Sequence, residues 1–402
     1  MPILEKSVVL DYTYKNRQQH SLSLWLAIPP QMACQRVKKV TYSTEPQELS
    51  EYLGQELAYY QLAPGETINV RAEMDLYSSS LEEDEAPETL SLEEKQFYLR
   101  NTYLSPVNET MREKAEEISQ NAENPIEKLQ YLFEHIYNTY TYHFPPEKRG
   151  ASFFLKEGKG DCGEFSFLFC SYARALGIPC RSVIGAFMKK FQPHVWNECY
   201  IEEYGWVPID TSVAASLKKN NSLLRHPLQR GESTGVFHYF GEFSGRRVVF
   251  CLDAEWPLSP EYNDTKAPAG YPLSTFGKEN FAYGFQSLSG SAPYLQPIYT
   301  KFKDMPSPGK ITDVLGTWNV RDDSLYLQSL LFIKQTSYYL FIAAMLASIA
   351  AVFFMDNFYF LTAGYMLAAS GLGASILRKE YNGVIVLGFI VSVVISVMYL
   401  II

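Results

Sequence analysis

Charged residues are nearly absent from the C-terminal end of the chain, and this constrains its fold more than any other feature of the sequence. From residue 335 to residue 402 only two short breaks carry charge, and they separate three apolar runs, 335–355, 357–377 and 381–402. A helix needs about 20 apolar residues to cross the hydrocarbon of a bilayer. The sequence therefore predicts three transmembrane helices within 335–402.

The breaks between the runs predict an orientation in the membrane. Asp356-Asn357 suits a tight turn between the first two runs, and Arg378-Lys379 lies between the second and the third. Because positive residues next to a span stay cytoplasmic, the soluble part is predicted to be cytoplasmic and the C-terminus to lie on the opposite side. The N-terminus has no apolar leader, which agrees with this orientation. Small residues spaced four apart between Gly364 and Gly373 predict close helix packing.

The rest of the chain is acidic and has the composition of a soluble protein. The chain has 35 Lys and Arg against 44 Asp and Glu, and the charges after residue 334 cancel, so the net charge of -9 lies on residues 1–334. Without a basic excess to displace counterions, nucleic-acid binding is not expected. The six cysteines form no CxxC pair, which argues against a zinc ribbon and favours free thiols. We expect no metal and no cofactor.

Residues 1–77 are predicted to form a β-sandwich-like module. Apolar and polar residues alternate over 22–28 and again over 68–76, which is the period of strands with one buried face. Proline and glycine residues between the two runs supply turns. An acidic segment that begins with serines follows over 78–95, and it is predicted to be a solvated linker.

Helix and strand signals dominate residues 96–250. An apolar face with helical spacing follows Pro125, and a second helix is predicted to open at Cys162 and to end at Gly177. Strands are expected over 181–187, 195–201, 206–210 and 246–251. Residues 251–334 are rich in Gly, Pro and Tyr without a clear period, so a specificity lid, a small third domain and simple packing stay open for this extension.

Three residues of this region suit nucleophilic catalysis. Cys162 lies at the predicted start of a helix, where unpaired N–H groups and the helix dipole favour a thiolate. His194 begins one strand and Asp210 ends the next, so an imidazole and a carboxylate can meet there. In such a triad the histidine takes the thiol proton and the carboxylate orients the imidazole. Each residue alone is more often structural, and only the set in this order points to chemistry.

Four motifs in sequence order resemble the transglutaminase-like superfamily. They are GKGDCGEF at 158–165, ARALGIPCR at 173–181, HVWNE at 194–198 and GWVPID at 205–210. The resemblance implies an α+β fold, in which a papain-like catalytic core over 96–250 follows the β module and precedes the transmembrane helices. It also implies that Cys162 is the nucleophile, His194 the general base and acid, and Asp210 the orienting carboxylate.

The activity that the resemblance implies is acyl transfer through a thioester, either to water, as in a cysteine protease or amidase, or to an amine, as in a transglutaminase. We therefore expect a membrane-anchored cysteine hydrolase or acyltransferase that acts on peptide or protein amide bonds. Trp196 and Trp206 are candidates for the substrate cleft. The alternative is a catalytically inactive module of the same fold that binds a peptide or protein partner.

Overall fold

The computed structural model of the chain describes residues 3–78, 81, 89–188, 193–219, 239–242, 245–262, 290–291, 295–301, 312–322, 325–351, 358–377 and 383–401. The chain divides into two compact units, one made of residues 1–219 and 236–321 and the other containing the C-terminal helices. Three predicted features, the acidic stretch 82–88, the Asp356-Asn357 turn and the Arg378-Lys379 loop, lie outside the described residues.

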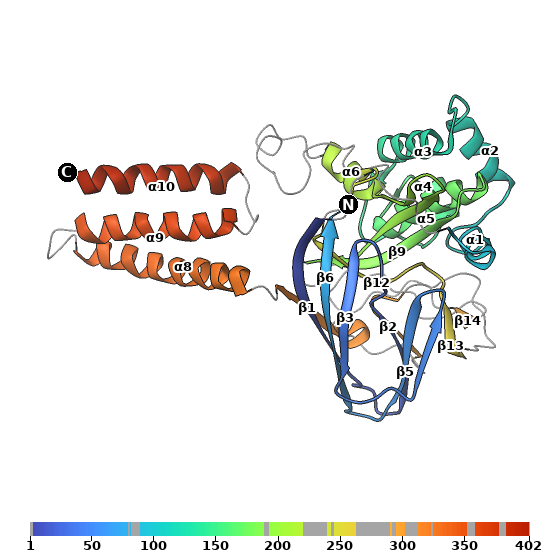
Figure 1. Cartoon of the computed structure of the whole chain (residues 1–402), viewed down its shortest axis with the longest axis horizontal. Helices are drawn as coiled ribbons and strands as arrows, with labels where there is room; N and C mark the ends of the chain where they lie inside the picture. Colours follow the sequence, from blue (N-terminus) through green and yellow to red (C-terminus); the bar gives the residue numbers. More distant parts are fainter. Residues whose placement is uncertain are drawn as a thin grey trace. The chain divides into compact units, whose positions relative to one another are not determined.

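The N-terminal module is built from two four-stranded sheets (Figure 1). One sheet has the order β16 (Thr317–Asp322), β1 (Ile3–Lys15), β6 (Thr67–Ser78) and β3 (Gln35–Tyr42). The other has the order β15 (Ile298–Lys301), β2 (Leu22–Ile28), β5 (Gln55–Leu62) and β4 (Glu48–Tyr52). The alternation in the sequence reflects their shared core, because Val70 and Met74 of β6 are buried in one cluster with Leu24 of β2. The predicted strands at 22–28 and 68–76 are confirmed.

The edge strands β15 and β16 lie more than 200 residues after the other strands of these two sheets. Ile298 pairs with Leu26 and Lys301 with Ser23, so β15 covers the edge of β2. An open strand edge has unpaired backbone groups that need a partner. The extension 251–334 is therefore more than an irregular appendage, because two of its segments complete the sheets of the N-terminal module.

The predicted catalytic core is a four-stranded sheet packed on a central helix (Figure 1). The strand order is β11 (Gly205–Ile209), β10 (Pro193–Ile201), β9 (Cys180–Phe187) and β12 (Arg247–Cys251). Helix α5 (Cys162–Ala175) packs on β9 and β10, and its residues after Cys162 are all buried. Helix α3 (Pro125–Thr139) begins at the predicted proline and buries its apolar face. The helices and strands predicted for this region are confirmed to within two residues at their ends.

The remaining elements of this unit are short. They are α1 (Leu92–Tyr98), α2 (Glu109–Ile118), β7 (Thr141–Tyr142), α4 (Ala151–Glu157), β8 (Lys159–Gly160), α6 (Thr211–Lys219), β13 (Pro257–Tyr262), β14 (Gly290–Ser291) and α7 (Thr312–Leu315). Helix α1 begins inside the predicted linker, since Ser91 and Glu94 form a capping box there. The solvated linker predicted over 78–95 is thus too long at its C-terminal end, because the cap satisfies the first backbone donors of a helix.

Two buried glutamines join the β module to the sheet of the core. The Gln35 amide donates to the Val249 carbonyl at 3.1 Å and accepts from the Val249 N–H at 2.8 Å. The Gln55 amide accepts from the Leu252 N–H at 3.1 Å. Buried amide groups are held firmly by such bonds, because breaking one leaves a desolvated polar group without a partner. The β module and the core therefore meet through specific polar contacts at β12.

The second unit contains the three helices α8 (Leu325–Ala351), α9 (Phe358–Leu377) and α10 (Gly383–Ile401). Within the described residues, Ser329–Ile349 and Tyr359–Leu377 are long and apolar enough to cross a membrane, whereas the apolar part of α10 is shorter. Helix α9 packs against both neighbours (Figure 1). The small residues predicted to allow close packing lie at these contacts, since an added Cβ on Gly373 would lie 3.2 Å from the Phe389 ring.

Candidate active site

Cys162 is the first residue of α5, and the residues around it explain why the helix begins there. The Asp161 carboxylate accepts a hydrogen bond from the Gly163 N–H at 2.8 Å, and the Glu164 carboxylate accepts one from the Asp161 N–H at 3.3 Å. This reciprocal capping box satisfies backbone donors that have no acceptor inside the first helical turn. The cap fixes Cys162 at the predicted place, the start of a rigid helix.

Two glycines shape the approach of the chain to Cys162. Gly158 ends α4 in the left-handed conformation, with φ of 70°, which glycine adopts without steric penalty. Gly160 packs so closely against α5 that an added Cβ would lie 2.6 Å from the Cβ of Glu164. Larger residues at either position would displace the turn that carries the cap.

The hairpin of β10 and β11 brings His194 and Asp210 together. In its antiparallel register Asn197 lies opposite Ile209, so the start of β10 and the residue after β11 share one end of the hairpin. The Nε2 atom of His194 lies 2.7 Å from Oδ2 of Asp210. Phe187 stacks on the imidazole with ring centroids 4.5 Å apart. The contact occupies Nε2 and leaves Nδ1 of the imidazole for another partner.

Arg247 joins this pair, and the sequence alone did not reveal it. One of its guanidinium nitrogens lies 2.7 Å from the same Asp210 oxygen that His194 contacts, and both side chains are buried. Burial alone would raise the pKa of Asp210, but the His194 and Arg247 charges outweigh it and hold that pKa below its usual range. The sequence predicts the strand that begins with Arg247. Its partner lies 37 residues earlier, however, and no local motif marks such a contact.

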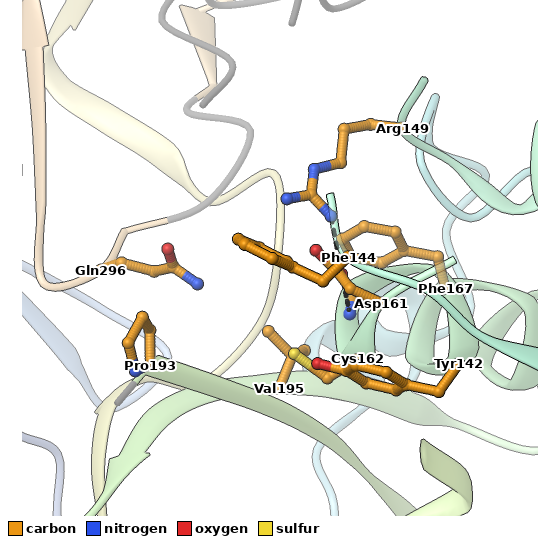
Figure 2. A pocket seen from close by; sticks show the side chains of 10 residues that line it. Tyr142, Phe144, Arg149, Asp161, Cys162, Phe167, Pro193, Val195 and Gln296 are labelled. Atoms are coloured by element: carbon orange, nitrogen blue, oxygen red, sulfur yellow. Dashed lines mark hydrogen bonds and ion pairs between the residues drawn. The ribbon is translucent and has the colours of Figure 1, made fainter. Parts of the chain in front are cut away.

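A small pocket of about 70 Å³ lies beside Cys162 (Figure 2). It is lined by Tyr142, Phe144, Arg149, Asp161, Cys162, Gly163, Phe167, Pro193, Val195 and Gln296. All six cysteines lie in described segments, and five of them are buried while Cys162 is partly exposed. The thiol predicted to be the nucleophile is therefore the one that a substrate can reach.

A backbone group links Cys162 to the strand of His194. The N–H of Val195, the residue after His194, donates a hydrogen bond to the Cys162 sulfur. Within the described residues the thiol and the imidazole make no direct hydrogen bond. Catalytic hydrogen bonds in free enzymes are often long and shorten when substrate binds. The structure thus brings His194 and Asp210 into direct contact, and it brings Cys162 next to Val195, the residue that follows His194.

The environment of Cys162 favours a neutral thiol. Burial raises its pKa above the ordinary value, and the charge of Asp161 raises it further. The Val195 N–H and the Arg149 guanidinium lower the pKa without outweighing these effects. The expectation that the helix N-terminus alone favours a thiolate is therefore wrong for the resting site, because desolvation of the sulfur dominates. A base has to remove the proton before the sulfur can attack.

A buried arginine and two acids form the wall next to the thiol. Arg149 lies 2.7 Å from Oδ1 of Asp161 and 2.8 Å from Oε2 of Glu164. Burial raises the pKa of Glu164 well above its ordinary value, whereas Arg149 and the hydrogen bonds of the cap overcome burial and lower the pKa of Asp161. Among the described residues, no group of three or more His, Cys, Asp or Glu side chains is placed to hold a metal ion.

The two tryptophans predicted for the substrate cleft do not line this pocket. Trp196 is fully buried and stacks on the His194 ring with centroids 6.0 Å apart, since residues two apart on a strand share a face. Trp206 packs against the Arg181 guanidinium, 3.9 Å from its ring centroid. Both indoles therefore pack against neighbouring side chains and do not line the pocket of Cys162. The aromatic rings that do line the pocket are Tyr142, Phe144 and Phe167.

Three known proteins are similar to parts of this chain. An uncharacterised protein of Haemophilus influenzae is 24% identical over 163 residues, which cover 32% of this chain and 43% of that protein. The chain thus matches less than half the length of this relative. A candidate cysteine protease from Cytophaga hutchinsonii has 18% identity and a TM-score of 0.41 over 51% of this chain and 75% of that one. The periplasmic domain of TgpA from Pseudomonas aeruginosa has 13% identity and a TM-score of 0.33 over 54% and 90%.

The family itself is identified by the part of the chain that carries the four motifs. The family model described as the transglutaminase-like superfamily matches residues 112–211. This range contains Cys162, His194 and Asp210 together with the helix and the hairpin that position them. The segment from residue 112 to residue 211 is a transglutaminase-like core.

Proposed function

We propose that this protein is a cysteine-nucleophile hydrolase or acyltransferase that acts on peptide or protein amide bonds through a thioester. The observation that carries the proposal is the 2.7 Å contact between His194 Nε2 and Asp210 Oδ2 beside the pocket of Cys162. That contact holds the imidazole in the orientation in which Nδ1 is free to take a proton. Cys162, whose sulfur is the reachable one, supplies the nucleophile.

The reaction would follow the general course of acyl transfer at a thiol. His194 Nδ1 takes the Cys162 proton as the sulfur attacks the carbonyl carbon, and the carbonyl electron pair moves to oxygen. When this pair returns, the carbon–nitrogen bond breaks and His194 gives its proton to the leaving amine. A thioester remains on Cys162. Water or a second amine then attacks it, His194 acts again as base, and the thiol is released.

Because the environment favours a neutral thiol, proton removal accompanies the attack on substrate. Asp210, whose low pKa keeps it ionised, stabilises the imidazolium that forms at this step. Arg247 binds the same carboxylate oxygen and holds it in place from the other side. In this scheme Asp210 and Arg247 are positioning residues, and Cys162 and His194 are the residues that touch the reacting atoms.

The proposal is tested with the full chain in detergent and with fluorescently labelled casein as the probe. Release of small fragments would indicate hydrolysis, and incorporation of dansylcadaverine would indicate transfer to an amine. Cys162→Ala should abolish both without lowering the unfolding temperature, whereas Cys251→Ala, at a buried cysteine of β12, should keep the activity. Activity that survives in Cys162→Ala would refute the proposal. Casein that is bound but never modified by the wild type would favour the non-catalytic binding module.

We further propose that the C-terminal helices anchor the protein in a membrane with the soluble unit in the cytoplasm. The lengths of Ser329–Ile349 and Tyr359–Leu377, 21 and 19 residues, support two crossings. The positive pair Arg378-Lys379 follows the second crossing, on the side where the chain enters the first. If α10 is a third crossing, the C-terminus lies on the opposite side.

A further inference from the structure

Two of the elements that position Cys162 also build the pocket beside it. Gly163 and Phe167 are four residues apart on α5, so both lie on the face of the helix that borders the pocket. An added Cβ on Gly163 would lie 3.3 Å from the Phe167 ring, so a larger residue there would crowd this border. Pro193 and Val195 are two residues apart on β10 and supply a second apolar border. A helix and a sheet therefore limit the size of the pocket on two sides.

Two aromatic side chains of the pocket are exposed. Tyr142 and Phe144 are two residues apart in the segment that follows α3, and both line the pocket. Their exposed fractions are 37% and 45%. Figure 2 shows the Phe144 ring and the Gln296 side chain pointing toward each other across the pocket. Exposed apolar surface that is continuous with a pocket is typical of a ligand-binding site.

The charged residues of the pocket bind each other. Among the described lining residues these are Arg149 and Asp161, which lie 2.7 Å apart and are both buried. A charged substrate side chain would have to break this ion pair or lose its water without gaining a partner. An apolar side chain has no such cost, so the pocket favours apolar groups.

The size of the pocket limits which apolar group can enter. For attack, the carbonyl carbon has to come within about 3.5 Å of the sulfur. The residue that bears this carbonyl therefore lies at the pocket, and its side chain has to share a volume of about 70 Å³. A cavity of about 150 Å³ holds one benzene molecule. The smaller volume suits a side chain of a few carbon atoms and excludes an aromatic ring.

We propose that this pocket selects the residue that supplies the attacked carbonyl, and that it favours a small apolar side chain such as that of alanine or valine. The proposal rests on the function proposed above and narrows its substrates to amide bonds whose carbonyl belongs to such a residue. Phe144 sets the upper size limit, because its ring borders the pocket without belonging to the hydrophobic core.

The test compares three peptide aldehydes, N-acetylglycylglycinal, N-acetylglycylalaninal and N-acetylglycylphenylalaninal, with the full chain in detergent. The Cys162 sulfur adds to the aldehyde carbon and the thiol proton ends on the oxygen, so the aldehyde residue takes the place of the acyl residue. Binding is measured as protection of Cys162 from methyl methanethiosulfonate. The alaninal should bind about fourfold tighter than the glycinal, which is the gain expected for burying one methyl group. The phenylalaninal should bind at least tenfold more weakly than the alaninal.

Phe144→Ala should remove the discrimination against the aromatic aldehyde. The substitution takes from the pocket the same ring that the phenylalaninal brings, so the affinity for phenylalaninal relative to alaninal should rise at least tenfold over wild type. Phe144→Leu should shift this ratio less, in the same direction. A variant that is only misfolded would lose affinity for all three aldehydes and gain none. Tyr131→Ala is the matched control, because this tyrosine of α3 is 39% exposed but does not line the pocket, and its ratio should equal that of wild type.

The outcomes separate this inference from the proposed function. Wild type that binds the phenylalaninal as tightly as the alaninal would overturn the inference, and so would a ratio that Phe144→Ala and Phe144→Leu leave unchanged. The function stands in both cases, because the aldehydes still bind at Cys162. If wild type binds none of the three although methyl methanethiosulfonate modifies Cys162, the proposed function fails and the inference fails with it.

Discussion

Replacing Asp161 by asparagine should make the Cys162 thiol more reactive at neutral pH. The Asp161 carboxylate raises the pKa of this thiol, second only to burial. Asparagine caps helices as well as aspartate does, and its oxygen can still accept from the Gly163 N–H. The substitution therefore removes one negative charge and leaves α5 capped. It also releases Arg149 from one of its two acids, which acts in the same direction.

The expected change in the alkylation rate depends on two opposing factors, the fraction of thiolate and the nucleophilicity of that thiolate. A nearby like charge changes an ionisation equilibrium about tenfold or more, and we take the lower end because Arg149 already offsets Asp161. The thiolate fraction at pH 7 should thus rise about tenfold. A less basic thiolate is a weaker nucleophile, however, by about threefold for such a change. The net expectation is a rate of alkylation about three times that of wild type.

The assay is alkylation of the full chain by iodoacetamide at pH 7, with the Cys162 peptide quantified by mass spectrometry. The five other cysteines are buried and react slowly in the folded protein. Glu164→Gln is the matched control, because Arg149 contacts this acid too, yet its raised pKa favours the neutral form. A rate in Asp161→Asn equal to or below wild type would show that the reasoning about Asp161 is wrong. An equal increase in Glu164→Gln would assign the effect to Arg149.

Two other predictions concern the ion pair between Arg247 and Asp210 and the side of the membrane on which Cys162 lies. Arg247→Met should lower the free energy of unfolding by about 3 kcal/mol, since it breaks a buried ion pair while Asp210 keeps its bonds to His194, Ser212 and Val213. Folding lowers the pKa of Asp210, so the loss of unfolding free energy in Arg247→Met should be complete above about pH 4 and should shrink below it. A loss of unfolding free energy that does not change with pH would contradict this explanation. In sealed right-side-out vesicles, a membrane-impermeant methanethiosulfonate should reach Cys162 only after permeabilisation, and labelling before it would reverse the proposed orientation.

The parts of the site that the sequence predicts correctly are those held by local contacts. Asp161 and Glu164 are three residues apart, so the cap that places Cys162 is visible in one short motif. His194 and Asp210 belong to one hairpin, and strand alternation with a turn between them is enough to predict that they meet. The three apolar C-terminal helices are likewise predicted from composition over single continuous runs, and two of them are long enough to cross a membrane. Each of these inferences needs only the residues of one or two adjacent elements.

The parts that the sequence did not predict depend on distant contacts or on desolvation. Arg247 of β12 and Gln296, two residues before β15, reach the site from far along the chain, and neither has a spacing that distinguishes it from a surface residue. Residue type alone makes Trp196 and Trp206 candidates for the cleft, but it does not show that His194 and Arg181 pack against these two indoles. The helix dipole is predictable from position, but the burial that outweighs it at Cys162 depends on tertiary packing.

Strands from late in the sequence complete the two N-terminal sheets. This explains why the pocket is lined in part by residues outside the segment that matches the family. Segment 112–211 contains Cys162, His194 and Asp210, but the arginine that contacts Asp210 and the glutamine in the pocket wall come later in the sequence. Gln296 is placed by β15 on β2, and β12 is tied to the β module by Gln35 and Gln55. A shift in the register of β15 by one residue would turn its side chains to the other face of the sheet and move Gln296 along the pocket wall. The geometry around Cys162 is therefore a property of the whole first unit, residues 1–219 and 236–321, because segments from its β module and from its later strands both place residues at the pocket.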